Sequence, residues 1–106
     1  METRILLIVA GTNVPSNSAT LAEAFLEGVR QIPNVTLHTL SLKDLHIEHF
    51  TMECYGSHCP YHDDFPLLHE HIAQAHGVVI ATPIWNFSVP AHLKNVIDRM
   101  GAFALD

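Results

Sequence analysis

Three short stretches of the chain have the hydrophobic pattern of β-strands. Residues 4–10 and 78–82 are apolar almost throughout and rich in branched side chains, as in parallel strands that helices cover on both faces. Residues 35–40 instead alternate apolar and polar side chains, which is typical of a strand near a sheet edge with one face less buried. The pattern therefore predicts three strands, with residues 4–10 at the centre of the sheet.

Apolar residues recur at helical spacing in three other segments. The first helix follows a loop at residues 11–18 and ends before Pro33. The second covers residues 65–75, and the third begins at Pro90, a residue that favours the first turn of a helix. Residues 43–64 show no sustained period, so we expect a long irregular connection there with room for one short helical turn.

The alternation of strands with helices predicts one α/β domain over residues 1–106. Consecutive parallel strands need right-handed crossovers, which place helices on both faces of the sheet. Ligands of such sheets bind outside the carboxyl ends of the strands. The loops after the first and third strands, residues 11–18 and 83–89, are therefore the expected binding region.

The composition narrows the classes of function. With 48% hydrophobic and 15% charged residues among 106, the chain is expected to form one globular core. A formal net charge of −6 leaves no basic surface for nucleic acid or an anionic membrane, and an anion must be held mainly by N–H groups and hydroxyls. The first apolar run is too short to cross a bilayer, and two cysteines make no disulfide framework, so we expect a cytoplasmic protein.

The loop at residues 11–18 combines small polar residues with a helix start. The N–H groups and the dipole of a helix start attract a negative ligand, and Thr12, Ser16 and Ser18 add hydroxyl donors. The loop has neither the glycines of a dinucleotide-binding fingerprint nor the lysine of a Walker A loop. A phosphate site is one interpretation, and simple capping of the helix, with Ser18 and Thr20 as equally good caps, is the other.

The loop after the third strand carries two aromatic side chains, Trp85 and Phe87, with Asn86 between them. Large apolar side chains at a solvated end of a sheet indicate a flat apolar ligand. Packing under the following helix or in a subunit interface explains them equally well. The residues alone leave both interpretations open.

Both loops, and the second more specifically, resemble those of a known family. The segments Gly11–Ser18 and Ala81–Arg99 resemble the NAD(P)H-dependent FMN reductases and azoreductases, a branch of the flavodoxin-like superfamily. The resemblance implies that the first loop contacts the phosphate of FMN and that the second contacts its isoalloxazine ring. The implied cofactor-binding residues are Thr12, Ser16, Asn17 and Ser18 for the phosphate, and Pro83, Ile84, Trp85, Asn86 and Phe87 for the ring.

The same resemblance implies an activity. Such an oxidoreductase takes hydride from NADH or NADPH as co-substrate and passes it through FMN to a small-molecule acceptor such as a quinone, an azo compound or free flavin. No catalytic side chain is implied, because the flavin carries the chemistry. Relatives usually form homodimers with the flavin near the interface. Lys94, Asn95 and Asp98 match a helix motif of the family that we interpret as mainly structural.

The resemblance extends over the whole chain, but this length corresponds to roughly the first three-fifths of a usual flavodoxin-like domain of the family. In the flavodoxin-like strand order 2-1-3-4-5, residues 78–82 would then form an uncovered apolar edge. We expect a chain truncated after its third β-α unit, with a sheet of order 2-1-3 and with marginal stability or self-association. A non-catalytic fragment that needs a partner is an alternative.

A metal-binding module is an alternative of another class. Cys54, His58, Cys59 and His62 lie within nine residues, and thiolate and imidazole are suitable zinc ligands. Their spacing differs from the usual pairs of zinc ligands, and Pro60 disfavours a helix that would bring the two histidines onto one face. We expect no metal and two ordinary thiols in a loop, with a redox pair as the less favoured interpretation. The other histidines are interpreted as solvated: His69, His71, His76 and His92.

Overall fold

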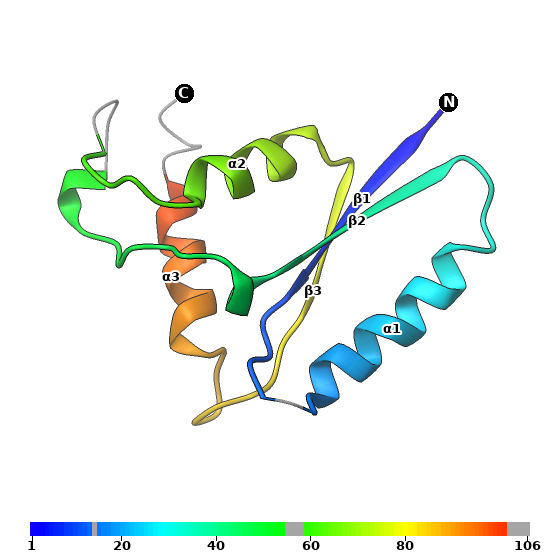
Figure 1. The fold of residues 1–106 in the computed structure, drawn as a ribbon, viewed down its shortest axis with the longest axis horizontal. Coiled ribbons are helices and arrows are strands. Elements are labelled where there is room, and N and C mark those ends of the chain that lie inside the picture. The colour runs from blue at the N-terminus through cyan, green and yellow to red at the C-terminus, as the bar shows by residue number, and fades with distance from the viewer. Residues whose placement is uncertain (14, 55–58, 102–106) are drawn as a thin grey trace.

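A three-stranded parallel sheet forms the centre of the molecule in the computed structural model, which describes residues 1–13, 15–54 and 59–101 (Figure 1). Its strands are β1 (Thr3–Val9), β2 (Val35–Ser41) and β3 (Gly77–Ala81). The order is β2-β1-β3, and both neighbouring pairs are parallel. The predicted strands, their order and the central place of the first strand are confirmed, with ends that differ by about one residue.

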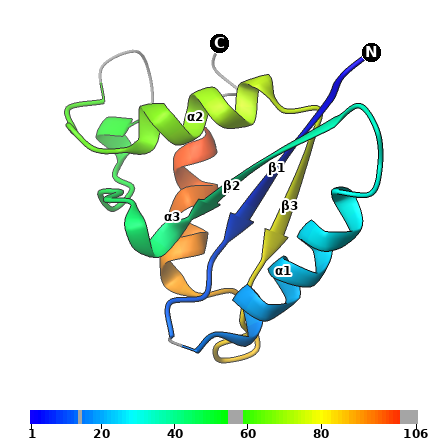
Figure 2. The same ribbon diagram turned by 45° about the vertical axis from the view of Figure 1, so that its right-hand side comes forward.

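Helices cover both faces of this sheet, as the turned view makes clear (Figure 2). Helix α1 (Asn17–Val29) lies on one face, and α2 (Phe65–Gln74) and α3 (Ala91–Arg99) lie on the other. Because side chains alternate across a strand, β1 serves both layers. Leu7 and Val9 pack with α1, while Leu6, Ile8 and Ala10 pack with α2 and α3. None of the helices in the described ranges combines the length and apolar composition that a membrane crossing requires.

The start of α1 differs from the expectation. Ser16 is the N-cap: its backbone is extended, with φ −118° and ψ 130°, and its Oγ accepts a hydrogen bond from the N–H of Ala19 at 3.2 Å. Thr20 is inside the helix and donates its hydroxyl to the Ser16 carbonyl at 3.1 Å, and Ser18 is buried in the first turn. The prediction of Ser18 or Thr20 as the cap was wrong, because the chain becomes helical two residues earlier than Ser18 requires.

The connection between β2 and α2 is irregular, as predicted, but its described part contains two 3₁₀ turns, Leu42–Asp44 and Met52–Cys54, where one was expected. A buried ion pair anchors it: Arg99 Nη1 of α3 lies 2.8 Å from Asp63 Oδ2, and the two side chains are 4% and 0% exposed. Arg99 also donates to the Glu48 carbonyl at 2.9 Å. These bonds hold a segment without regular structure against a helix that follows much later in the chain.

One edge of the sheet exposes apolar side chains. Val78 and Ile80 of β3 are aligned with Leu6 and Ile8 of β1, and they therefore face the layer of α2 and α3. Val78 is 41% and Ile80 44% exposed, whereas their neighbours on β1 are buried. Among the described residues no strand pairs with the outer side of β3. The expectation of an uncovered apolar edge at the third strand is thus confirmed.

Candidate functional site

The loops after β1 and β3 lie side by side at the carboxyl end of the sheet (Figures 1 and 2). The Ala10 N–H donates to the Ala81 carbonyl at 2.8 Å, which extends the pairing of the strands to the point where both loops begin. Between the loops and the start of α1 lies a cleft of about 410 Å³. Its lining residues are Gly11, Thr12, Asn13, Pro15, Ser16, Asn17, Ser18, Leu21, Thr82, Pro83, Ile84 and Trp85.

Most of the predicted site residues meet in this cleft. Seven of the nine line it: Thr12, Ser16, Asn17, Ser18, Pro83, Ile84 and Trp85. Asn86 and Phe87 do not. Sequence reasoning missed Leu21, an apolar residue of the first helix that is 70% exposed. Its position one turn after Asn17 is the signal that could have found it, since residues four apart share a helix face.

The first loop presents donors without any charged side chain. The Ser16 Oγ and carbonyl oxygen accept from Ala19 and Thr20, whereas the N–H groups of Asn17 and Ser18 have no partner within the helix by its geometry. The residues that line the cleft include no acidic or basic side chain. A negative group here would be held by the helix start and by hydroxyls, as the composition led us to expect.

Gly11 permits the close turn that brings this loop over the helix start. A Cβ atom at residue 11 would lie 2.3 Å from Ser16 Oγ and 3.3 Å from Ser18 Oγ. Such a distance from Ser16 is too short for any real Cβ, so a side chain at this position would displace the cap. The loop therefore depends on a glycine at its first position, a requirement that the sequence alone did not reveal.

The second loop is a tight turn with an aromatic tip. Trp85 and Ser88 exchange two backbone hydrogen bonds, of 2.9 and 3.1 Å. The two residues between them, Asn86 and Phe87, have φ values of 50° and 66°, which is the conformation of a type I′ turn. Phe87 is fully exposed, and a bulky side chain rarely adopts this backbone region. Burial does not compensate this conformation at Phe87, because its side chain is in solvent.

His92, in the first turn of α3, joins the two loops. Its Nε2 lies 2.5 Å from the Ala10 carbonyl oxygen, and its ring makes an edge contact with Trp85, with centroids 5.7 Å apart and planes at 67°. The interpretation of His92 as a solvated residue was therefore wrong. The local sequence gave no signal for this role, because Ala10 and His92 are 82 residues apart.

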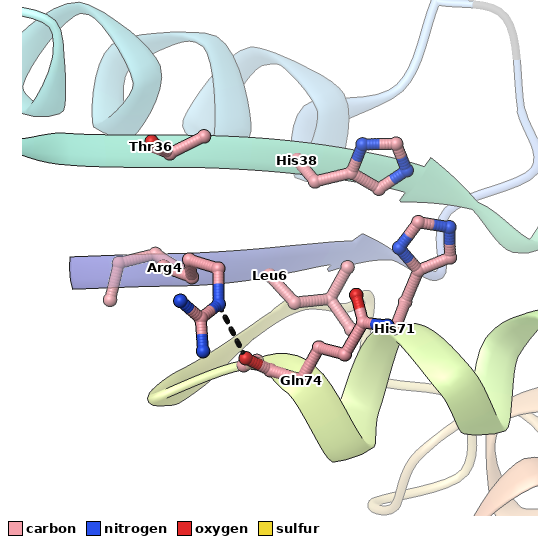
Figure 3. Close-up of a pocket in the computed structure, with 8 residues that line it drawn as sticks. Arg4, Leu6, Thr36, His38, His71 and Gln74 are labelled. Atoms are coloured by element: carbon pink, nitrogen blue, oxygen red, sulfur yellow. Dashed lines mark hydrogen bonds between the residues drawn. The ribbon is translucent and has the colours of Figure 1, made fainter. Parts of the chain in front are cut away.

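A second cavity, of about 200 Å³, lies between the first half of β1, β2 and α2 (Figure 3). His38 and His71 stack beside it, with ring centroids 4.0 Å apart and planes at 10°, so His71 is not simply solvated either. Burial and then the neighbouring His71 lower the pKa of His38. Arg4 Nε donates to the Gln74 carbonyl at 2.8 Å, and His76 Nδ1 accepts from the Arg4 N–H at 2.9 Å. This cavity lies away from the carboxyl ends of the strands, where ligands of such sheets bind.

The cysteines are close to each other. Cys54 and Cys59 are both free thiols, and their sulfur atoms lie 3.2 Å apart. In the described part of the chain, no three His, Cys, Asp or Glu side chains are grouped so that they could hold a metal ion. His58, which belonged to the metal-binding alternative, lies outside the described residues.

Comparison with known proteins adds a family match. Residues 3–105 match the family model of the NADPH-dependent FMN reductases. An NAD(P)H-dependent FAD/FMN reductase of Geobacillus thermodenitrificans (strain NG80-2) is 34% identical over 102 residues, which are 94% of this chain and 53% of the relative. A quinone reductase of Escherichia coli (strain K12) is 64% identical over 31 residues, 29% of this chain and 16% of its own length.

Solved structures of low sequence identity share the fold. An azoreductase from Bacillus anthracis str. Sterne superimposes with a TM-score of 0.73 at 22% identity, over 92% of this chain and 55% of that protein. RosB, solved with a bound flavin-derived intermediate, superimposes with a TM-score of 0.80 at 19% identity, over 93% of this chain and 42% of that one. The chain spans about half the length of the curated relatives that it matches over most of its own length.

Proposed function

The chain belongs to the NADPH-dependent FMN reductase family, and from this membership we propose that it holds FMN in the cleft between its two loops. The protein is then an NAD(P)H-dependent oxidoreductase whose electron acceptor is a small molecule such as a quinone, an azo compound or a flavin. Bound FMN would supply the hydride transfer between NAD(P)H and this acceptor. The observation that carries the proposal is one cleft that combines an uncharged, donor-rich helix start with an apolar, aromatic loop.

The start of α1 is the proposed phosphate site. Thr12, Ser16, Asn17 and Ser18 line the cleft at the positive end of the helix dipole. The N–H groups of the first turn and the nearby hydroxyls donate to phosphate oxygens, and no lysine or arginine is needed. The Ser16 cap keeps these donors in place.

The loop after β3 is the proposed ring site. Pro83, Ile84 and Trp85 line the cleft and offer flat apolar surface to an isoalloxazine ring. For Asn86 and Phe87, at the tip of the turn, we propose a contact with the edge of the ring outside the wall of the cleft. His92 positions the loop through its contacts with Ala10 and Trp85. These residues bind and orient the flavin, and we assign no acid or base among them.

We also propose a cytoplasmic homodimer. Two free cysteines are usual in a reducing compartment. Ile84, which lines the cleft, is 78% exposed, and Phe87 in the same loop is fully exposed. A partner subunit that covers them would bury apolar area next to the flavin.

Flavin titration tests the proposal. We expect the purified protein to quench the fluorescence of FMN and riboflavin, and to oxidise NAD(P)H when a quinone or an azo compound is added. Ser16→Asp keeps a side chain that can cap the helix but adds a negative charge. It should weaken the binding of FMN on the order of tenfold or more, and the binding of riboflavin much less. Ser16→Asn is the matched control, because it caps the helix without a charge. Trp85→Ala should weaken both ligands about equally.

Three results would contradict the proposal. A folded protein that neither quenches flavin fluorescence nor oxidises NAD(P)H would show that the two loops are structural. If Ser16→Asp lost equal affinity for FMN and for riboflavin, the phosphate would not bind at the helix start. If Trp85→Ala kept full affinity for both flavins, the isoalloxazine ring would not bind at the second loop.

A further inference from the structure

Cys54 and Cys59 are placed to react with each other. Cys54 ends a 3₁₀ turn and is buried, whereas Cys59 is exposed. The Cys59 thiol donates a hydrogen bond to the Cys54 sulfur across 3.2 Å. A disulfide bond is about 2.05 Å long, so the two sulfurs need to approach each other by only about one ångström. This contact was not expected from two ordinary thiols in a loop.

A fixed positive charge lies beside the two sulfurs. Arg99 Nη2 is 3.8 Å from the Cys59 sulfur, and Asp63 and the Glu48 carbonyl hold the guanidinium in place. Burial opposes ionisation of Cys54, but hydrogen bonds with Thr51 and Cys59 and the charge of Arg99 outweigh it, so the pKa of the Cys54 thiol lies below its ordinary value. Burial and the Cys54 sulfur raise the pKa of Cys59. Cys54 therefore ionises more readily than Cys59, whereas Cys59 is the thiol that a molecule from solvent can reach.

We propose that Cys54 and Cys59 are a dithiol–disulfide site that exchanges electrons with low-molecular-weight disulfides. The exposed Cys59 loses its proton to solvent and attacks one sulfur of R–S–S–R, which breaks that bond and releases R–S⁻. Cys54 then loses its proton and attacks the Cys59 sulfur, which breaks the mixed disulfide and expels the second R–S⁻. Two protein thiols are oxidised to one disulfide, one R–S–S–R is reduced, and the two protons that the cysteines lose protonate the two leaving thiolates.

The same surroundings explain why a redox pair fits better than a metal site. The guanidinium next to the sulfurs favours thiolate, and the described residues offer no group of three His, Cys, Asp or Glu side chains that could hold a metal ion. The exposure of Cys59 lets reducing thiols reach the disulfide, so the site is reversible. The proposal does not depend on flavin binding, because neither cysteine lines the cleft at the carboxyl end of the sheet.

Equilibration with oxidised and reduced glutathione tests the site. The equilibration is carried out under native conditions and in urea. Free thiols are then trapped by alkylation, and the intact mass of the chain is measured. We expect the native chain to lose both thiols together and two hydrogens in mass, with an equilibrium constant on the order of tenfold or more above that of the urea-unfolded chain. In Cys54→Ser the reaction should stop at the mixed disulfide, with one glutathione bound to Cys59. Cys59→Ser should react on the order of tenfold more slowly, because its remaining thiol is buried.

Three results on the unmodified chain would overturn the proposal, independently of either variant. Equal equilibrium constants for the native and unfolded chains would show that the fold does not prearrange the pair and would overturn the proposal. So would stable glutathione adducts on the unmodified sequence, or disulfides that form only between chains on a non-reducing gel.

Discussion

Replacing Arg99 with methionine should destabilise the chain strongly, because it leaves the buried Asp63 carboxylate without its counter-charge. In the intact protein this carboxylate accepts hydrogen bonds from Arg99 at 2.8 Å and from the N–H groups of Glu48 at 2.8 Å and Phe65 at 3.0 Å. Methionine keeps apolar contact with Phe65, whose ring centroid lies 4.6 Å below the guanidinium carbon. The substitution therefore isolates the loss of charge and donors from the loss of packing.

The magnitude follows from burial. Removing one partner of a buried ion pair costs about 3–5 kcal/mol, since an uncompensated charge stays behind. A folded domain has a free energy of unfolding of roughly 5–15 kcal/mol, so Arg99→Met should remove about a fifth of it or more. The matched control is Lys94→Met, which breaks the Lys94–Asp98 pair; its side chains are 60% and 38% exposed, and its loss should cost at most about 1 kcal/mol.

Urea unfolding followed by circular dichroism measures both variants. The pH dependence of the stability gives a second test. Burial opposes ionisation of Asp63, but the hydrogen bonds that this carboxylate accepts from Arg99, Glu48 and Phe65 outweigh burial. The pKa of Asp63 therefore lies below its ordinary value. A lowered carboxyl pKa gives stability that is present above about pH 4 and lost as the pH falls through the folded-state pKa. The difference between the intact chain and Arg99→Met should therefore shrink in acid. An Arg99→Met midpoint equal to that of Lys94→Met at pH 7 would refute this reasoning.

Substitutions at two glycines and one histidine test smaller features of the structure. Gly11→Ala should lower the free energy of unfolding by about 0.5–2 kcal/mol, as much as Ser16→Ala does, because the new Cβ displaces the Ser16 cap. The double variant should lose no more than either single variant. Gly28→Ala is the control in the same urea assay: nothing lies within 4 Å of the new Cβ, so it should stabilise α1 by up to about 1 kcal/mol. His71→Gln should raise the pKa of His38 in an NMR titration, since one cause of its lowering is gone. The lowered pKa of His38 gives stability above about pH 6.5 that is lost in acid, so the variant should lose less stability between pH 7 and 5, and an unchanged His38 titration would disprove the coupling.

The hydrophobic pattern by itself determined the layout of the fold. The continuous apolar run that became β1 is typical of a strand covered on both faces, and the helical stripes supply that cover. The position of the cleft follows from the same topology, because parallel strands bring their carboxyl ends together. Seven of the nine predicted site residues line it for that reason.

Only the tertiary structure decided the contacts that join distant parts of the chain. Asp63 and Arg99 are 36 residues apart, and Ala10 and His92 are 82 apart. Such pairs leave no periodic trace in the sequence, because each depends on one side-chain direction in the assembled layers. The sequence did not reveal the cap at Ser16 or the left-handed backbone at Asn86 and Phe87 either, although both are local features. Periodicity reports which face of an element is buried, and three-dimensional packing alone selects its partner.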